Sequence, residues 1–261
     1  MCGRYVTVST VQTIEKRFGV RANDPSKHLP NTNVSPGELA PVIASNKPGE
    51  LQHFTFGLTP SWAKKAMYLI NARSEGDHNK DNDPGYTGAR GIITKPSFRK
   101  AIRSQRCLVI ADAFIEGPEK EKLSKPYCVY LRNKERPFAM AGIWDEWSHP
   151  ETGEVIHSFS IVTTVANAVL QAIGHHRSPV ILTRENERDW LNPDLPLADV
   201  TAMLNPFDAE KMNAYPIGPE IKSVRNKGLS LLDPIGERIF PEADIHLKQE
   251  TRLQGMGRRK W

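Results

Sequence analysis

The order of strand-like and helix-like segments constrains the fold of this chain more than any other feature of its sequence. Helical patterns come before and after a run of β-type segments and do not alternate with them in βαβ units. This order predicts an α+β fold, with a mostly antiparallel β core and flanking helices. The β-type segments are CLVI at 107–110, YCVYL at 127–131, FAMAGIW at 138–144 and HSFSIVTT at 157–164.

Helices are expected on both sides of this β core. The first should run from Ser9 to Gly19, because Ser9 and Gln12 form a capping-box pair and Gly19 stops the helix. Pro96 should open a second helix, since proline suits the first helical position. Further helices are predicted at 166–173, 184–191 and 197–203.

The 261 residues are enough for one sizeable core. No internal repeat or linker divides the chain, so we expect one domain over residues 1–240. Within it, residues 76–91 (GDHNKDNDPGYTGARG) are polar and lack periodicity, which predicts a mobile surface loop. Residues 241–261 should form a poorly ordered basic tail.

Positive charge is concentrated in that tail. The formal net charge is +5, yet residues 245–261 alone hold five Lys or Arg and one Glu. The remaining 30 basic and 29 acidic residues give a net charge of +1. An anionic partner would therefore need locally clustered basic side chains rather than a basic protein as a whole.

The cysteines and the apolar segments exclude several classes of protein. Cys2, Cys107 and Cys128 are odd in number and widely spaced, which argues against a disulfide framework and against paired zinc ligands. No apolar run approaches the roughly 18 residues of a membrane-spanning helix. The opening MCGRYVTVST does not resemble a secretory signal. We expect a cytoplasmic monomer, associated with the nucleoid if bacterial, that uses no cofactor or metal.

Cys2 has the most distinctive chemistry in the sequence. Because Cys is small, the initiator Met1 is normally removed, which leaves an α-amine and a thiol on the same residue. The amine of such a 1,2-aminothiol condenses with an aldehyde, and the thiol then closes a five-membered thiazolidine ring. Position alone, however, would favour an incidental residue at a flexible terminus.

The rest of the chain strengthens the case for Cys2 through short motifs. These are MCGRY at 1–5, NVSPG at 33–37, GLTPSW at 57–62, NARSE at 71–75, KPSFRKAIRSQRCLVIADAFIEG at 95–117, PFAMAGIWDEW at 137–147, HHRSP at 175–179 and VRNKG at 224–228. Together they resemble the SOS response-associated peptidase (SRAP) family over residues 1–235. Any one motif is weak, but their succession in the family's order is specific.

The resemblance implies a single SRAP-type domain that processes abasic sites in single-stranded DNA. In this family the N-terminal Cys forms a covalent thiazolidine with the ring-opened sugar aldehyde of the abasic site. Cys2 would be the nucleophile, Asn71 would hold its amine and thiol, and Glu116 would be the general acid and base. His175 would protonate the sugar ring oxygen. His175 is chosen over His176 because the family's His precedes Arg by two positions.

Taken one at a time, these residues also fit ordinary roles. Asn71 could be a turn residue after a strand AMYLI at 66–70, and Glu116 a surface carboxylate. His175 could be a structural residue at a helix end. Only their shared motif context assigns them to one site.

DNA contacts are implied by the same motifs. Arginine forks bind phosphate oxygens bidentately, and exposed rings stack on bases. A basic edge of Lys95, Arg99 and Arg103 extends the backbone track or is a solvated helix face. The predicted DNA-binding residues are Arg4, Pro36, Trp62, Arg73, Thr164 and Arg177.

Three positions depart from the family's common pattern. Gly117 stands where a Trp commonly follows the glutamate, Phe56 replaces another Trp, and Ser178 replaces the usual Met. None of these removes a predicted catalytic group. Gly117 does remove a stacking surface, which affects the expected DNA affinity and junction preference more than the chemistry.

Three functions are compatible with these residues. The first is the DNA–protein crosslinker, with crosslink reversal and strand incision as side activities, and autoproteolytic removal of the first residue would be common to this function and the next. The second is a peptidase or amidase that uses Cys2 as an N-terminal nucleophile. The third, a non-enzymatic single-strand-binding module, is the weakest because the body of the chain is nearly neutral. Arginines within two residues of the predicted catalytic positions favour DNA over a peptide.

Overall fold

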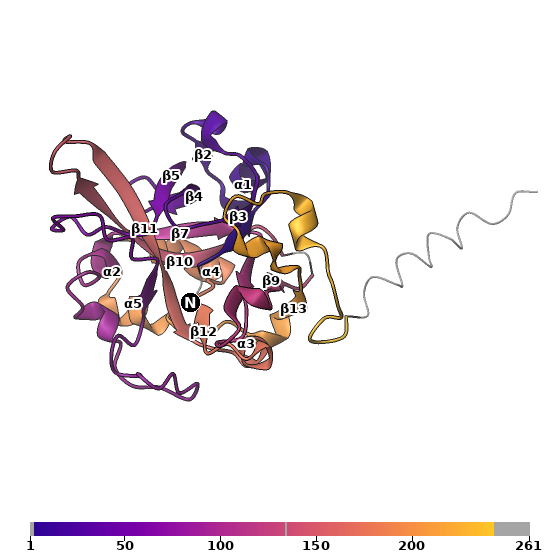
Figure 1. The fold of residues 1–261 in the computed structure, drawn as a ribbon. Coiled ribbons are helices and arrows are strands. Elements are labelled where there is room, and N and C mark those ends of the chain that lie inside the picture. The colour runs from indigo at the N-terminus through magenta and orange to yellow at the C-terminus, as the bar shows by residue number, and fades with distance from the viewer. Residues whose placement is uncertain (1–2, 134, 243–261) are drawn as a thin grey trace, which may run out of the picture.

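The computed structural model describes residues 3–133 and 135–242, and strands occupy its centre (Figure 1). The larger of its two sheets closes on itself, because β5 (Glu50–Phe56) pairs in parallel with β11 (Val155–Val165) as well as with its antiparallel neighbour β4 (Leu39–Ala44). A small barrel of β11, β10, β7, β4 and β5 results, and β6 (Asn71–Arg73) adds to β11. The sheet order is β12 (Arg177–Pro179), β11 (Val155–Val165), β10 (Phe138–Ser148), β7 (Arg106–Ala111), β4 (Leu39–Ala44), β5 (Glu50–Phe56) and β2 (Arg21–Ala22).

The smaller sheet is antiparallel throughout. Its order is β13 (Met212–Pro216), β9 (Tyr127–Leu131), β8 (Ala113–Glu116), β1 (Tyr5–Thr7) and β3 (Asn31–Val34). The chain passes from the barrel strand β7 to β8 through Asp112 alone. The Asp112 carboxylate accepts hydrogen bonds from the backbone N–H groups of Val8 (2.6 Å) and Ser9 (2.8 Å), which fixes the chain as it leaves β1.

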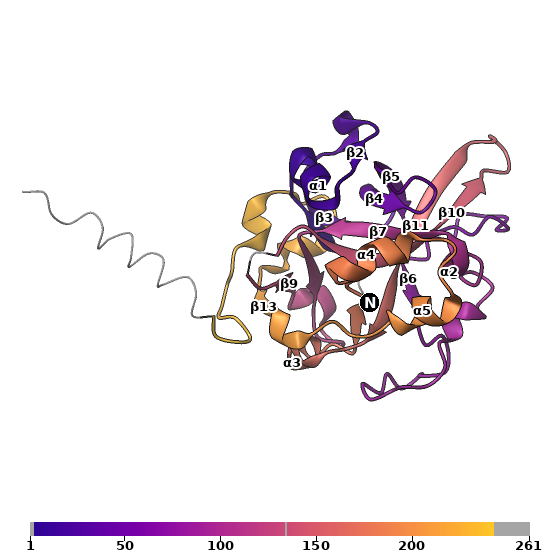
Figure 2. The same ribbon diagram turned by 180° about the vertical axis from the view of Figure 1, so that it is seen from behind.

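Helices cover the outer face of the barrel. They are α1 (Val11–Phe18), α2 (Ala101–Ser104), α4 (Arg184–Leu191) and α5 (Leu197–Ala202), whereas α3 (Ala168–Ile173) packs against β13 of the smaller sheet. Figure 2 shows α4 and α5 lying across this face, where Trp190 and Val200 are buried against barrel residues such as Leu108. A second core, with Phe56 and Phe114, joins the barrel to the smaller sheet. Short 3₁₀ turns lie at Pro25–Lys27, Gly91–Ile93, Lys122–Ser124, Ala209–Lys211, Pro219–Lys222 and Leu229–Leu232.

A buried arginine joins the helical layer to the barrel. Arg106, the first residue of β7, is fully buried. Its guanidinium donates to the carbonyl oxygens of Trp190 (2.6 Å) and Ile102 (2.9 Å), which lie in the last turns of α4 and α2. Carbonyls at helix ends lack partners within the helix, so a cation there satisfies them. Burial lowers the pKa of Arg106 to about 10, which still leaves it charged near neutral pH.

The predicted α+β class is confirmed, as are the expected strands and most of the helices. Two local predictions are wrong. Thr10, not Ser9, caps α1, because its hydroxyl accepts from the Thr13 N–H. The helix after Pro96 forms only at Ala101–Ser104, and residues 96–100 are turns.

Other segments differ from their expected form or lie outside the description. No strand forms over 66–70, and the strand begins at Asn71 itself. Residues 76–91 are a chain of turns that ends in the 3₁₀ turn at Gly91–Ile93. Of the predicted tail, residues 243–261 lie outside the described residues. Within the described part of the chain, no helix is long and apolar enough to cross a membrane.

Candidate active site

Glu116 and His175 meet at the end of a central strand. Glu116 is the last residue of β8 and pairs with Tyr127 of β9, so its backbone is held within the sheet. His175 follows α3, which ends at Ile173 and is capped by Gly174 in the left-handed conformation (φ 83°) that glycine adopts without strain. His175 Nε2 lies 3.4 Å from Glu116 Oε2, and the two side chains are only 6% and 5% exposed. His176 instead faces Glu119 near the surface.

A backbone carbonyl sets the tautomer of His175. Nδ1 lies 2.8 Å from the Gly117 carbonyl oxygen, which can only accept, so Nδ1 carries the hydrogen. Burial lowers the pKa of His175 to about 3, and the imidazole is therefore neutral near neutral pH. Its Nε2 lone pair then faces the Glu116 carboxyl group. A proton placed between these two atoms can move to either one, which is the arrangement that general acid–base catalysis requires.

The N-terminal strand leads to this pair. Tyr5 of β1 pairs with Phe114 of β8, and the Ile115 N–H donates to the Arg4 carbonyl oxygen at 2.9 Å. Because the strands are antiparallel, residues before Tyr5 run toward the Glu116 end of β8. Met1 and Cys2, the predicted nucleophile, lie outside the described residues.

Asn71 and Arg73 lie on β6, beside the barrel strand β11. Asn71 pairs with Ile161 and Arg73 with Thr163, so the two side chains share a face of the strand. The Asn71 amide donates to the Ile70 carbonyl oxygen at 3.0 Å. The Arg73 guanidinium donates to Asn82 Oδ1 at 2.8 Å and to the Asn79 carbonyl oxygen, which ties β6 to the 76–91 segment.

Arg177 is held by a carboxylate that the sequence analysis missed. Its guanidinium makes a bidentate pair with Glu75 (2.9 and 3.2 Å) and reaches Thr163 Oγ1 at 3.3 Å. Arg73 Nε lies 3.9 Å from the same carboxylate, so Glu75 joins both arginines. Burial alone would raise the pKa of Glu75, but the hydrogen bonds and charge of Arg177 hold it below its ordinary value. A buried arginine needs a counterion, and Glu75, two residues after Arg73, was the available signal.

Comparison with known proteins identifies the family. The model of the SOS response associated peptidase (SRAP) family matches residues 1–224. The chain belongs to the SRAP family. It is 34% identical over 240 residues to the abasic site processing protein YoqW of Bacillus subtilis, across 89% of this chain and 99% of that protein. It is 27% identical over 246 residues to the abasic site processing protein YedK of Escherichia coli, across 90% of this chain and 100% of that protein.

A solved structure is also similar to this chain, in both fold and sequence. The crystal structure of a protein from Bacteroides thetaiotaomicron matches with a TM-score of 0.76 at 30% identity, covering 90% of this chain and 100% of that one. This likeness extends over both sheets and agrees with the α+β architecture of the SRAP chain.

Of the three departures from the SRAP pattern, the one at Gly117 has a structural reason, and the other two residues are buried. A Cβ atom at Gly117 would lie 1.9 Å from the Lys122 carbonyl oxygen, so the turn over 118–125 leaves no room for a side chain. Phe56 is buried, stacked on Phe159 at 5.3 Å between ring centroids. Ser178 is also buried, and its hydroxyl donates to the Pro179 carbonyl oxygen. In this SRAP chain, backbone occupies the space that a side chain at 117 would need.

The predicted DNA contacts divide into exposed and buried groups. Pro36 is exposed, and Trp62 is 58% exposed beside a hollow of about 350 Å³ that Arg99 and Lys100 also line. Thr164, by contrast, is fully buried and donates to the Leu204 carbonyl oxygen.

The predicted basic edge does not form as one track. Lys95 pairs with Asp77, and Arg103 donates to the Ile93 carbonyl oxygen. Arg99 remains beside Trp62.

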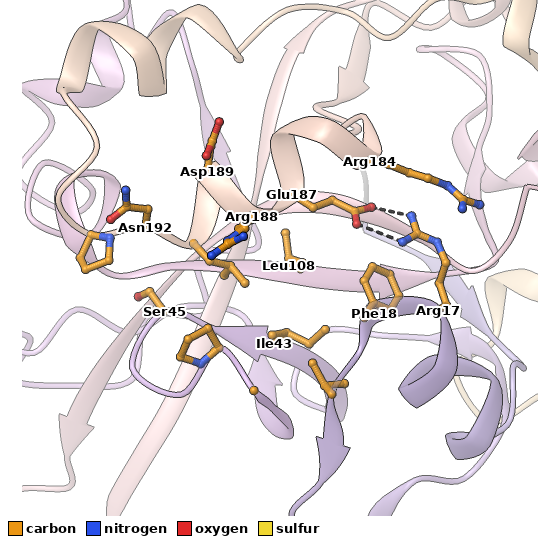
Figure 3. A pocket seen from close by; sticks show the side chains of 15 residues that line it. Arg17, Phe18, Ile43, Ser45, Leu108, Arg184, Glu187, Arg188, Asp189 and Asn192 are labelled. Atoms are coloured by element: carbon orange, nitrogen blue, oxygen red, sulfur yellow. Dashed lines mark hydrogen bonds and ion pairs between the residues drawn. The ribbon is translucent and has the colours of Figure 1, made fainter.

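A cavity of about 680 Å³ opens between α1 and α4, away from these groups (Figure 3). Its floor is apolar, and a bidentate pair between Arg17 and Glu187 (3.1 and 2.7 Å) forms part of its wall. None of the residues that line it is a predicted site residue.

The other reactive side chains lie in the core. Burial raises the pKa of the Cys128 thiol to about 11 and that of the Cys107 thiol further, so neither is a nucleophile at neutral pH. Over residues 3–133 and 135–242, no three His, Cys, Asp or Glu side chains gather as metal ligands.

Proposed function

We propose that this SRAP chain crosslinks to abasic sites in single-stranded DNA through Cys2, once Met1 has been removed. The observation that carries the proposal is the buried Glu116–His175 contact at the end of β8, to which the N-terminal strand leads. The names of YoqW and YedK, both abasic site processing proteins, support an abasic site as the substrate.

The reaction needs no oxidant or cofactor. The Cys2 amine attacks the aldehyde carbon of the ring-opened sugar, and the resulting carbinolamine loses water to give an imine. The Cys2 sulfur then adds to the imine carbon, and the thiol proton passes to nitrogen as the thiazolidine ring closes. Reversal follows the same steps in the opposite direction, so crosslink release belongs to the proposal, as does strand incision from the imine.

Glu116 and His175 would move the protons of these steps. The departing water needs an acid, and the attacking amine needs a base. With Nδ1 committed to the Gly117 carbonyl, His175 works through Nε2, which would accept a proton from the Glu116 carboxyl group and return it. Asn71 would orient the amine and thiol through its amide, which donates and accepts without carrying charge.

The strand of DNA would be held by charge and by exposed rings. Arg73, Glu75 and Arg177 together carry one net positive charge, and Arg4 adds another beside β8. Pro36 and Trp62 would contact bases, and Thr164 would support the pocket from within β11.

The basic tail 241–261 would add nonspecific attraction for phosphate. We further propose one domain over residues 1–240, acting as a cytoplasmic monomer.

A peptidase that uses the same Cys2 nucleophile is the alternative. It would share Asn71, Glu116 and His175 as helpers, and removal of Met1 would be its self-processing step. The positive cluster around Glu75 favours DNA, because hydrolysis of a peptide does not call for phosphate-binding groups.

The decisive experiment mixes the protein with an abasic single-stranded oligonucleotide and follows a heat-stable adduct on a denaturing gel. Cys2→Ala should abolish the adduct, whereas Cys128→Ala, which removes a buried thiol, should keep it. Cys2→Ser should give only an imine that borohydride traps. Retention of Met1 should block the reaction, since the α-amine is then part of a peptide bond. An equal adduct yield from Cys2→Ala and the native protein would refute the proposal.

A further inference from the structure

Lys227 closes a contact between the C-terminal segment and the turn that carries Pro36. Its Nζ lies 2.9 and 3.1 Å from the two carboxylate oxygens of Glu38. It also lies 2.7 Å from the Asn33 carbonyl oxygen and 3.0 Å from Asn31 Oδ1. One ammonium group therefore meets acceptors on both sides of the β3–β4 turn.

Glu38 is the centre of that turn. Its Oε2 accepts from the Ser35 N–H at 2.8 Å and from the Asn31 amide at 3.2 Å. The chain between them passes through Pro36 and Gly37, which has φ 89°. The Glu38 carboxylate thus fixes the shape of the turn, and its negative charge lies where the proposed function places DNA.

The segment that carries Lys227 is anchored separately. The fully buried Asn33 donates through its amide to the carbonyl oxygens of Ser223 (2.9 Å) and Asn226 (3.2 Å). On the other side of Lys227, the Gly228 N–H donates to Thr32 Oγ1 at 3.0 Å. Lys227 is therefore held at Glu38 by fixed backbone on both sides, so the contact with Glu38 does not have to order this segment.

Arg4 lies next to this turn. Tyr5 pairs with Val34, so the residue before Tyr5 is beside Ser35, at the start of the turn. Among the residues that the structure describes, none accepts a hydrogen bond from Arg4 Nε. Burial lowers the pKa of Arg4, and the negative charge of Glu38 opposes that effect. Glu38 is thus a competitor for the guanidinium that the proposed function assigns to phosphate.

We propose that Lys227 is a positioning residue that neutralises Glu38 within the Pro36 turn, so that Arg4 remains available for a phosphate of single-stranded DNA. The inference rests on the proposed function and deepens it. Without Lys227, the Glu38 carboxylate would repel the DNA backbone and draw Arg4 toward itself. The role is electrostatic, so it can be separated from a purely structural one by restoring neutrality in another way.

The test measures the affinity of full-length protein for an undamaged single-stranded oligonucleotide by fluorescence anisotropy at several salt concentrations. Lys227→Met should weaken binding roughly threefold to tenfold at low salt, as expected for one charge at a half-exposed site. It should also reduce the slope of log K against log salt by about 0.7 if one phosphate contact is lost. Lys227→Arg should bind like the native protein, and Lys222→Met, in the same segment, is the matched control.

The double variant Glu38→Gln with Lys227→Met decides between the two roles. If Lys227 acts by charge, removing the carboxylate as well should restore most of the affinity. A double variant as weak as Lys227→Met alone, or a Lys227→Met protein that binds normally, would overturn the inference. Failure of the native protein to bind the oligonucleotide or to form the abasic adduct would instead refute the proposed function.

Discussion

Two buried bidentate Arg–Glu pairs serve this molecule in different ways. Arg177–Glu75 lies in the candidate site, with side chains 4% and 0% exposed, and Arg17–Glu187 joins α1 to α4 beside the 680 Å³ cavity, with side chains 13% and 9% exposed. The first pair has a third member, Arg73, which leaves the cluster positively charged. The second is a neutral link between two helices. The same chemistry therefore gives a scaffold contact in one place and a positively charged cluster in the other, which the proposed function assigns to phosphate binding.

The pKa values of the two carboxyl groups differ accordingly. Arg177 holds the pKa of Glu75 below its ordinary value despite burial. At Glu187 burial outweighs Arg17, and the pKa is raised. Hydrogen bonds from its own backbone and from Ser74 also lower the pKa of Glu75, whereas the charge of Glu135 adds to the effect of burial at Glu187. Four pairs of variants test the difference between the two regions. Each pair compares one change in the candidate site with one change beside the cavity.

The largest effect should come from the chemical step. Glu116→Gln should slow adduct formation by about 10²–10⁴-fold, the range for loss of one proton-transfer group. Glu187→Gln changes a carboxyl group that is equally buried but remote, and should leave the rate unchanged. Single-turnover gel assays with excess protein measure both rates. Equal rates for Glu116→Gln and the native protein would remove Glu116 from the mechanism.

The next effect is on stability. Glu75→Ala leaves Arg177 buried without a counterion and should lower the free energy of unfolding by about 3–5 kcal/mol. Glu187→Ala should be similarly costly, because Arg17 is almost as buried. Only Glu75→Ala should also reduce adduct yield at a temperature where both variants are folded. Urea denaturation and the gel assay together check this, and a matched loss of yield in both variants would erase the distinction.

A smaller effect concerns salt. Arg73→Ala should reduce the slope of log K against log salt by about 0.7 for single-stranded DNA, since each phosphate contact contributes that amount. Arg188→Ala, on the rim of the cavity, is the matched control and should leave the slope unchanged. Anisotropy titrations at four or more salt concentrations suffice. Identical slopes for both variants would mean that the Glu75 cluster does not face DNA.

The smallest effect is on the pH dependence of stability. The folded-state pKa of Glu75 is depressed, so its contribution is present above the unfolded value of about 4.3 and is lost as pH falls through the folded pKa. The raised pKa of Glu187 has the opposite sign, because the folded state takes up that proton first. The cost of Glu75→Gln should therefore shrink as pH falls from 7 to 3, and that of Glu187→Gln should grow. Unfolding curves at each pH measure both trends.

The sequence predicts elements whose signals are local. The strand at 127–131 and the helix at 184–191 have the predicted bounds, because apolar patterning and flanking turn residues determine each of them. The short helix after Pro96 was overestimated, since the 95–105 segment is shaped by contacts such as that of Lys95 with Asp77. The closure of the barrel through β5 and β11 could not be predicted, because parallel pairing of strands about 100 residues apart leaves no local pattern.

The candidate site also contains residues that sequence motifs predict and residues that only the folded structure reveals. Motif context selected Glu116 and His175, and the structure brings the two into contact. Their roles, and those of Cys2 and Asn71, stay predictions. Glu75 was missed because a salt bridge between residues 102 positions apart is not visible in sequence order. The burial of Arg177 was not predicted either, since its motif indicates function but not burial.

One further consequence follows from the place of β1 in its sheet. Chain ends usually fray, but this strand begins at residue 5 and lies between β3 and β8, with Tyr5 fully buried. Opening it would require separation of two neighbouring strands at once. The backbone amides of Tyr5 and Val6 should therefore exchange with deuterated solvent only as slowly as the whole domain unfolds. The segment before Tyr5 would then keep its place near the Glu116 end of β8 until the whole domain unfolds.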